Sequence, residues 1–354
     1  MRSRVFAPFL VVLLCASVDL PAQDVAESGR THPTLKLMGF GDFNFFSGDN
    51  AQGQNESGFR EGQFVLHFVS QLTHSFSFFA EVSLTATEDN FRIEVERTFI
   101  QYSYNDNFKV AAGRFHTPIS WWNNAYHHGS WLQAAIVRPR MIAFGSEFVP
   151  IHFVGIVADG AIPSGSVNLN YMAGVGNGHD NNIARGGDAG DANNSRAAFV
   201  RLFARPSRPY GLESGFSYYV DRITPEAGEE FDEMIASVYV VNDRETPQVI
   251  AEYFHLEREG RESGQRFTSN AYYVQVGYRL PQWRGRLMPY ARYERSDVGT
   301  GEPVFSNFTS NEGGVVGLRL DAASFVALKA EFSRQRFESD PHVEGILVQV
   351  SYTF

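Results

Sequence analysis

The chain has little cysteine, few lysines and no long apolar segment beyond its first residues. Its 354 residues include one cysteine, so disulfides and thiolate metal sites are not expected to stabilise the fold. The net charge of -10 argues against a general nucleic-acid-binding protein, because such proteins neutralise phosphates with an excess of basic residues. After Leu14 no apolar run approaches the roughly 20 residues that a membrane-spanning helix requires.

Aromatic residues are plentiful instead. Phe, Tyr and Trp make up 14% of the chain, hydrophobic residues 43% and charged residues 20%. This composition is too apolar for a disordered chain. Abundant Phe, Tyr and Val are typical of a β protein.

The amino terminus has the pattern of an export signal. Arg2 and Arg4 precede an apolar run from Val5 to Leu14, after which the sequence becomes polar. We expect residues 1–22 to form a signal peptide that is cleaved after Ala22, with cleavage after Ser17 as a rival. A lipid anchor at Cys15 is less favoured, because the bulky Leu14 precedes it. The mature chain, residues 23–354, would then contain no cysteine.

The rest of the chain repeats one small unit, a segment of alternating polarity followed by a connector. In the last segment Ile346, Val348 and Val350 fall on one face, and Gln349 and Ser351 fall on the other. A period of two residues predicts β-strands. Sixteen strands are predicted, at residues 34–47, 59–72, 76–87, 91–104, 108–116, 151–160, 166–175, 196–206, 211–223, 234–242, 247–258, 269–280, 286–297, 311–320, 324–337 and 343–354.

The connectors alternate between long and tight, which is typical of outer-membrane barrels with short periplasmic turns and long external loops. A soluble β-sandwich also has alternating strands, but it does not require aromatic residues beside the tight turns. Such residues are present here and fit an interfacial girdle: Phe76, Phe108, Tyr210, Trp283, Phe325 and Phe354. We therefore expect an all-β fold, a closed antiparallel transmembrane β-barrel. Sixteen strands would enclose a water-filled interior, and closure leaves no unpaired backbone in outer-membrane lipid.

Several short motifs resemble those of bacterial outer-membrane porins. The terminal residues 350–354, Val-Ser-Tyr-Thr-Phe, resemble the signal through which the barrel assembly machinery recognises outer-membrane proteins, with Phe354 at its end. Residues 96–102, 111–118 and 171–178 resemble strands of porins of the phosphate-selective O and P type. No dense ladder of lysine and arginine is apparent, so the resemblance does not imply phosphate selectivity.

The resemblance implies a passive diffusion channel for small hydrophilic solutes or ions in the bacterial outer membrane, and a homotrimer. It also implies that the loop after the fifth strand folds inward and constricts the pore. The connector at residues 117–150, which follows the fifth predicted strand, is the longest in the chain.

Charged residues on the polar face of each strand are candidates for the pore wall, because a hydrated ion is stabilised by fixed charges near the narrowest point. The main candidates are Lys36, Asp42, Glu81, Arg97, Arg114, Arg201, Arg279 and Arg319. Further candidates on the same faces are Glu61, Arg205, Glu213, Glu252, Arg292, Glu294, Lys329 and Glu331. Basic and acidic residues nearly balance, so no strong ion selectivity is predicted. Arg114 is chosen over Lys109 because Phe115 is expected to face lipid.

The inward loop contains a group of aromatic and basic residues, namely Trp121, Trp122, His127, His128, Trp131, Arg138 and Arg140. They could stack on sugar rings, bind a metal or pack the loop against the barrel. Adjacent histidines in a strand or helix point in different directions, so packing is the preferred interpretation and no metal or cofactor is expected. Residues 177–195 include Asp180, Asp188 and Asp191 but lack the spacing of a calcium loop.

No motif indicates an enzyme. The chain contains no His-Glu-x-x-His, no Gly-x-Ser-x-Gly and no phosphate-binding Gly-x-x-x-x-Gly-Lys. We therefore predict no catalytic residues. The alternative to a channel is a non-conducting surface barrel whose external loops serve adhesion or ligand binding.

Overall fold

The computed structural model of the protein describes residues 32–49, 54–87, 89–179, 183, 187–191, 193–225, 228–338 and 340–354, with the backbone alone for residues 340 and 341. The predicted signal peptide at residues 1–22 and Asp180 lie outside the described residues. The unit from Pro33 to Phe354 contains all the strands.

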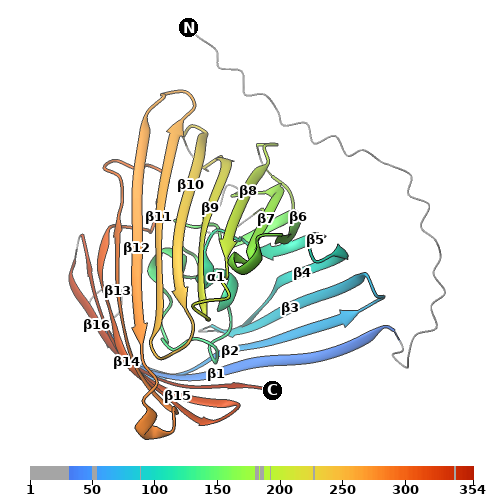
Figure 1. Cartoon of the computed structure of the whole chain (residues 1–354). Helices are drawn as coiled ribbons and strands as arrows, with labels where there is room; N and C mark the ends of the chain where they lie inside the picture. Colours follow the sequence, from blue (N-terminus) through green and yellow to red (C-terminus); the bar gives the residue numbers. More distant parts are fainter. Residues whose placement is uncertain are drawn as a thin grey trace. The chain divides into compact units, whose positions relative to one another are not determined.

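In the described part of the chain, sixteen antiparallel strands form a closed barrel (Figure 1). Each strand pairs with its neighbours in sequence, and β1 closes the ring by pairing with β16. The predicted fold class and strand count are confirmed. The strands are β1 (Thr34–Asp49), β2 (Asn55–Gln71), β3 (Phe76–Ala86), β4 (Phe91–Asn105), β5 (Phe108–His116), β6 (His152–Ile162), β7 (Leu169–Asn177), β8 (Ala197–Ala204), β9 (Leu212–Ile223), β10 (Phe231–Asn242), β11 (Gln248–Gly260), β12 (Arg266–Gly277), β13 (Leu287–Asp297), β14 (Asn311–Ala323), β15 (Val326–Phe337) and β16 (Asp340–Thr353).

Helical segments are short. They are α1 (Trp121–Ala125) and the single 3-10 turns η1 (Arg140–Ile142), η2 (Gly165–Val167) and η3 (Pro281–Trp283). Among the described residues, no helix has both the length and the apolar character needed to cross a bilayer.

The alternation of polarity separates an outer from an inner face. On β16, Ile346 and Val348 are 54% and 43% exposed, whereas Gln349 and Ser351 are 4% and 0% exposed. Large apolar side chains thus cover the outside, where they would contact lipid. The six aromatic residues predicted beside the tight turns are all exposed as well, as an interfacial girdle requires.

A β-bulge in β4 changes which residues face inward. Glu81 pairs with Arg97, but the next residue of β3, Val82, pairs with Val95, so Glu96 is the extra residue. Val95 is 49% exposed, whereas Glu96 is 2% exposed and Arg97 bonds to the inward-facing Glu81. A bulge allows two consecutive side chains to lie on the same side of a strand. It explains why Arg97 faces inward although it shares sequence parity with the outward-facing Val95.

Candidate functional site in the barrel interior

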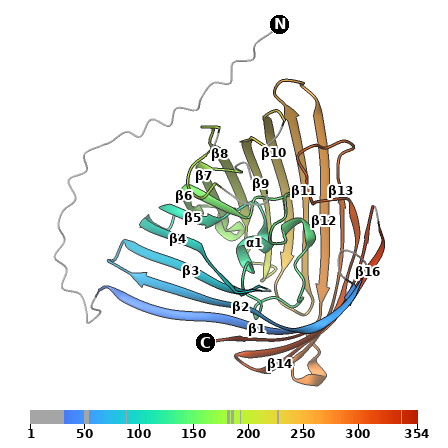
Figure 2. The ribbon, with the colours of Figure 1, turned by 180° about the vertical axis from the view of Figure 1, so that it is seen from behind.

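The segment between β5 and β6, residues 117–151, folds into the ring of strands; we call it the β5–β6 loop (Figure 2). Ser120 caps α1, its hydroxyl accepting a hydrogen bond from the backbone N–H of Asn123 at 3.1 Å. Trp122 and Phe148 of this loop are fully buried in one apolar cluster with inward-facing wall residues such as Tyr219 and Phe254. The loop therefore packs against the barrel wall.

A carboxylate on β11 holds the start of the loop. Glu252 accepts hydrogen bonds from the backbone N–H groups of Trp121 at 2.7 Å and Trp122 at 2.9 Å. The hydroxyl groups of Ser120 and Tyr273 donate to the same carboxylate. The first amides of a helix have no partner within the helix, so a buried carboxylate satisfies them and complements the helix dipole.

Charged residues on β13, β14 and β15 hold the second half of the loop through its backbone. Glu331 accepts from the N–H groups of Ile136 at 2.8 Å and Val137 at 3.0 Å. Basic side chains donate to carbonyl oxygens of the loop: Arg292 to Val137, Arg319 to Leu132 and Gln133, and Lys329 to Ser130. These charged side chains of the barrel wall bind the backbone of the loop. The polarity pattern of the sequence does not reveal such contacts.

A cavity of about 550 Å³ remains on the other side of the loop. It lies between the loop and the inner faces of β1, β2, β3 and β16. The lining contains acidic, basic, amide and imidazole side chains, among them Asp42, Asn44, Glu56, Arg60, Glu61, Gln63, Gln133, Arg138, His127, His128 and Gln349. Apolar side chains such as Phe46, Ile136 and Phe144 complete the lining. The charged and amide groups of the lining can hold water and hydrated solutes.

Of the eight main candidates for the pore wall, Asp42 lines this cavity. The buried Glu81 forms an ion pair with the partly exposed Arg97 at 2.5 Å and lies next to His67. Lys36 lies near the start of β1 and is exposed.

The remaining basic candidates on β8 to β14 bind other parts of the protein. Arg201 donates to Glu213 at 3.2 Å and to Tyr239 at 2.7 Å. Arg279 follows β12 and pairs with Glu245 and Asp321 at the tight-turn rim. Arg319 donates to the β5–β6 loop, as described above.

Arg114 needs a correction. Phe115 does not face lipid: it stacks on Phe99, with the ring centroids 4.9 Å apart, and it packs against the interior cluster. Arg114 pairs in register with Thr98 and forms an ion pair with Asp188 of the loop after β7. Neighbouring residues of a strand point to opposite faces, so Arg114 does not share the inward face of Phe115. The reason for choosing Arg114 over Lys109 was therefore wrong.

The aromatic and basic residues of the loop that were predicted as site residues make different kinds of contact. Trp121 and Trp122 pack against the wall, and the guanidinium of Arg319 lies 5.7 Å from the ring of Trp131. Arg138 donates to the carbonyl oxygens of His127 at 2.7 Å and Ile142 at 3.0 Å, which stabilises the loop conformation. The backbone N–H of Arg140 donates to Glu294 at 3.2 Å.

His127 and His128 correct the expectation that adjacent histidines diverge. They lie in the turn after α1, where strand and helix periodicity do not apply. Both imidazoles face the Glu96 carboxylate, with Nε2–O distances of 3.6 Å for His127 and 3.1 Å for His128. Sequence reasoning missed Glu96, because the bulge that turns it inward has no signal in the polarity pattern.

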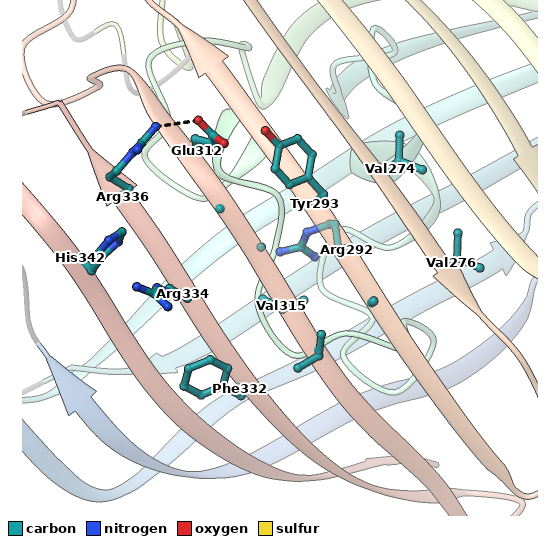
Figure 3. Close-up of a pocket in the computed structure, with 14 residues that line it drawn as sticks. Val274, Val276, Arg292, Tyr293, Glu312, Val315, Phe332, Arg334, Arg336 and His342 are labelled. Atoms are coloured by element: carbon teal, nitrogen blue, oxygen red, sulfur yellow. Dashed lines mark hydrogen bonds and ion pairs between the residues drawn. The ribbon is translucent and has the colours of Figure 1, made fainter.

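A second hollow, of about 630 Å³, lies on the outer surface over β12 to β16 (Figure 3). Gly313 and Gly314 leave room there between apolar side chains such as Val276 and Phe332. The ion pair between Arg336 and Glu312 closes one end of it. This groove is on the apolar outer face and is separate from the interior cavity.

Comparisons with known proteins agree with this architecture. The family model of the phosphate-selective porins O and P matches residues 37–257, more than half of the chain. The comparison with curated proteins found no match.

Solved structures with the same fold are distant in sequence. The anion-selective porin from Comamonas acidovorans is 11% identical and has a TM-score of 0.67, with 91% of this chain and 100% of that chain covered. The outer membrane channel DcaP of Acinetobacter baumannii is 11% identical, with a TM-score of 0.61 and coverage of 93% and 99%. A trimer form of OmpT from Vibrio cholerae is 11% identical, with a TM-score of 0.60 and coverage of 91% and 99%. On the family match and the closed sixteen-stranded barrel, the chain belongs to the family of phosphate-selective porins O and P and is an outer-membrane porin.

Proposed function

We propose that this porin conducts small hydrophilic solutes and ions passively through the interior cavity, and that the β5–β6 loop sets the width of the pore. One observation carries the proposal. The loop is bound through its backbone to charged residues of β11, β13, β14 and β15, while its other face borders the interior cavity, whose lining includes charged and amide groups. A loop fixed in this way narrows the lumen without closing it.

We also propose that the pore has no strong preference for phosphate. Selective binding of an anion requires basic groups that are free to face it. On the β13–β15 wall, Arg292, Arg319 and Lys329 instead donate to backbone carbonyls of the loop. The lining of the cavity contains carboxylates of Asp42, Glu56 and Glu61 beside Arg60 and Arg138.

Planar-bilayer recording tests both statements. Steady single-channel steps, a reversal potential near zero in a potassium chloride gradient and little block by added phosphate are the expected results. A silent membrane with folded protein would contradict conduction and support the non-conducting surface barrel. A strongly anion-shifted reversal potential with block by low phosphate would contradict the charge argument while leaving conduction intact.

The homotrimer and the absence of catalysis are part of the same proposal. One similar structure, OmpT from Vibrio cholerae, is described as a trimer form, which supports the expectation of a homotrimer for this chain. Light scattering of the detergent-solubilised protein, corrected for bound detergent, would give the mass of the assembly. A monomeric mass in mild detergent would contradict the trimer.

A further inference from the structure

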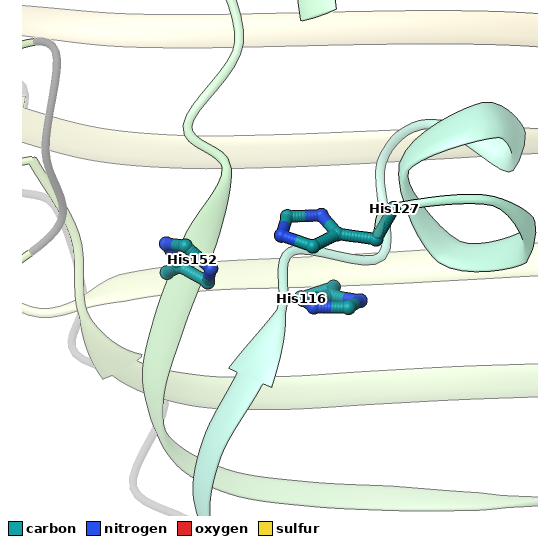
Figure 4. Close-up of side chains that lie close together, drawn as sticks. All are labelled: His116, His127 and His152. Carbon is teal, nitrogen blue, oxygen red and sulfur yellow. The ribbon is translucent and has the colours of Figure 1, made fainter. Parts of the chain in front are cut away.

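Four imidazoles and one carboxylate meet inside the barrel, where the β5–β6 loop approaches β4, β5 and β6. Figure 4 shows three of the imidazoles, those of His116 at the end of β5, His127 in the loop and His152 at the start of β6. His128 and the bulged Glu96 complete the group, which we call the histidine cluster. Glu96, His116, His127 and His128 are all less than 5% exposed.

We propose that the histidine cluster is a binding site for a divalent transition metal ion such as Zn²⁺, with Glu96, His127 and His128 as protein ligands and water in the fourth position. The ligand atoms of these three residues lie within 4.8 Å of one another, and the Nε2 atoms of His127 and His128 lie 3.6 and 3.1 Å from the carboxylate oxygens of Glu96. Tetrahedral zinc with bonds of about 2.0–2.1 Å separates neighbouring ligand atoms by about 3.3 Å. The two observed separations lie on either side of that value.

The hydrogen bonds of His127 and His128 leave Nε2 of each imidazole available as a metal ligand. Nδ1 of His127 lies 2.8 Å from the side-chain oxygen of Asn123, and Nδ1 of His128 lies 2.8 Å from that of Gln63. The Asn123 orientation is fixed, because its amide nitrogen donates to the carbonyl of Ile151 at 2.9 Å. Since an amide oxygen only accepts, each Nδ1 carries the hydrogen, and in the neutral imidazole Nε2 carries the lone pair. Such outer hydrogen bonds orient the histidine ligands of metal sites.

These lone pairs have no adequate partner in the protein. The Nε2 atoms of His127 and His128 are buried and make no well-aligned hydrogen bond in the described part of the chain. They face an acceptor, the Glu96 carboxylate, to which the hydroxyl of Ser83 donates at 2.6 Å. Among the described residues, histidines alone provide ion-pair partners for Glu96. A bound cation would satisfy the carboxylate and the two nitrogens together.

The chemical types of the ligands determine which metal ions the site favours, and the interior cavity gives the ion access to it. Imidazole with a carboxylate suits zinc and its neighbours in the first transition series, whereas calcium and magnesium prefer oxygen ligands alone. His127 and His128 line the interior cavity, which provides an entry path from water. His116 stacks on His127, with the ring centroids 3.5 Å apart, and supports its orientation. The ion would join the loop to β4.

Metal binding can be measured on the full chain, purified without a polyhistidine tag, folded in detergent and stripped with a chelator. After loading and dialysis, elemental analysis should find one Zn²⁺ more per chain in the wild type than in variants of the cluster, and Co²⁺ should give the intense visible absorption of a four-coordinate site. His127→Gln and His128→Gln should each weaken binding at least tenfold, since changes to the supporting residues alone cost about 10–100-fold. X-ray absorption of the zinc-loaded protein should show imidazole ligands, and it requires no variant.

His255→Gln is the matched control, because His255 on β11 bonds to Asn270 and belongs to no group of possible metal ligands among the described residues. It should leave the Co²⁺ absorption unchanged. No bound metal on folded wild-type protein would overturn the proposal and indicate protonated histidines instead. Wild-type affinity in the His127→Gln, His128→Gln double variant, or a zinc spectrum with oxygen ligands alone, would overturn it too. These readouts do not depend on whether the barrel conducts.

Discussion

Glu252 on β11 is the residue at which one substitution should loosen the β5–β6 loop from the wall. Its two carboxylate oxygens accept hydrogen bonds from the N–H groups of Trp121 and Trp122 and from the hydroxyls of Ser120 and Tyr273. Glu252→Gln keeps the shape of the side chain. It removes the charge and replaces one acceptor oxygen with an NH₂ group that cannot accept.

The cost follows from these contacts. One buried N–H group loses its acceptor, which costs about 1–3 kcal/mol, and the other donors exchange a charged acceptor for a neutral one, which costs about 1–2 kcal/mol more. The docking of the first half of the loop should therefore weaken by about 2–5 kcal/mol. At about 1.4 kcal/mol for each factor of ten, the docking equilibrium would shift by roughly 30-fold to a few thousand-fold.

Single-channel recording and tryptophan fluorescence report the release of the loop. Trp122 is fully buried when the loop is docked, so the variant should show red-shifted emission together with noisier and larger conductance steps. Glu213→Gln is the control, because Glu213 is a buried wall carboxylate whose hydrogen bonds go to Arg201, Arg205 and Tyr239 and not to the loop. If Glu252→Gln leaves both signals at wild-type values in a folded barrel, the carboxylate does not hold the loop.

Three further predictions concern the loop and the barrel end. Shortening the loop between Pro118 and Arg140 should raise single-channel conductance, because its residues border the cavity; unchanged conductance would show that the loop does not constrict the pore. Burial opposes ionisation of Glu147, but hydrogen bonds from Ser306 and from the backbone of Asn307 and Phe308 outweigh it and lower its pKa below the ordinary value of 4.5. A lowered folded-state pKa contributes stability that is present above pH 4.5 and lost as the pH falls through the folded value. Proteolysis of the external segment 298–310 should therefore increase only at strongly acidic pH, and Glu147→Gln should make it rapid at neutral pH as well; equal rates for wild type and variant at pH 7 would refute this. Phe354→Ala should reduce the heat-modifiable, folded fraction in outer membranes if Phe354 is read by the assembly machinery, whereas refolding into detergent in vitro should be affected less; equal membrane levels would contradict that role.

The repeating pattern of the sequence determined the architecture. Outward side chains must be apolar in lipid and inward ones must tolerate water, so every strand carries the same period of two residues. Local alternation of polarity was enough to predict the sixteen strands, including the last one at residues 343–354. Connector length was enough to predict the long loop after β5. Packing of the loop residues Trp121 and Trp122 against the barrel wall was also predicted, because large aromatic side chains are buried when a partner surface is near.

Only the tertiary structure decided what the inward residues do. A single bulge in β4 turned both Glu96 and Arg97 inward, and no polarity pattern marks the position of such a bulge. Arg319 and Lys329 bind carbonyl oxygens of the loop, because the partners of a charge depend on which distant backbone reaches it. The histidine cluster forms for the same reason. Its members come from β4, β5, β6 and a turn, and they converge because ring closure and the folded loop place those segments together.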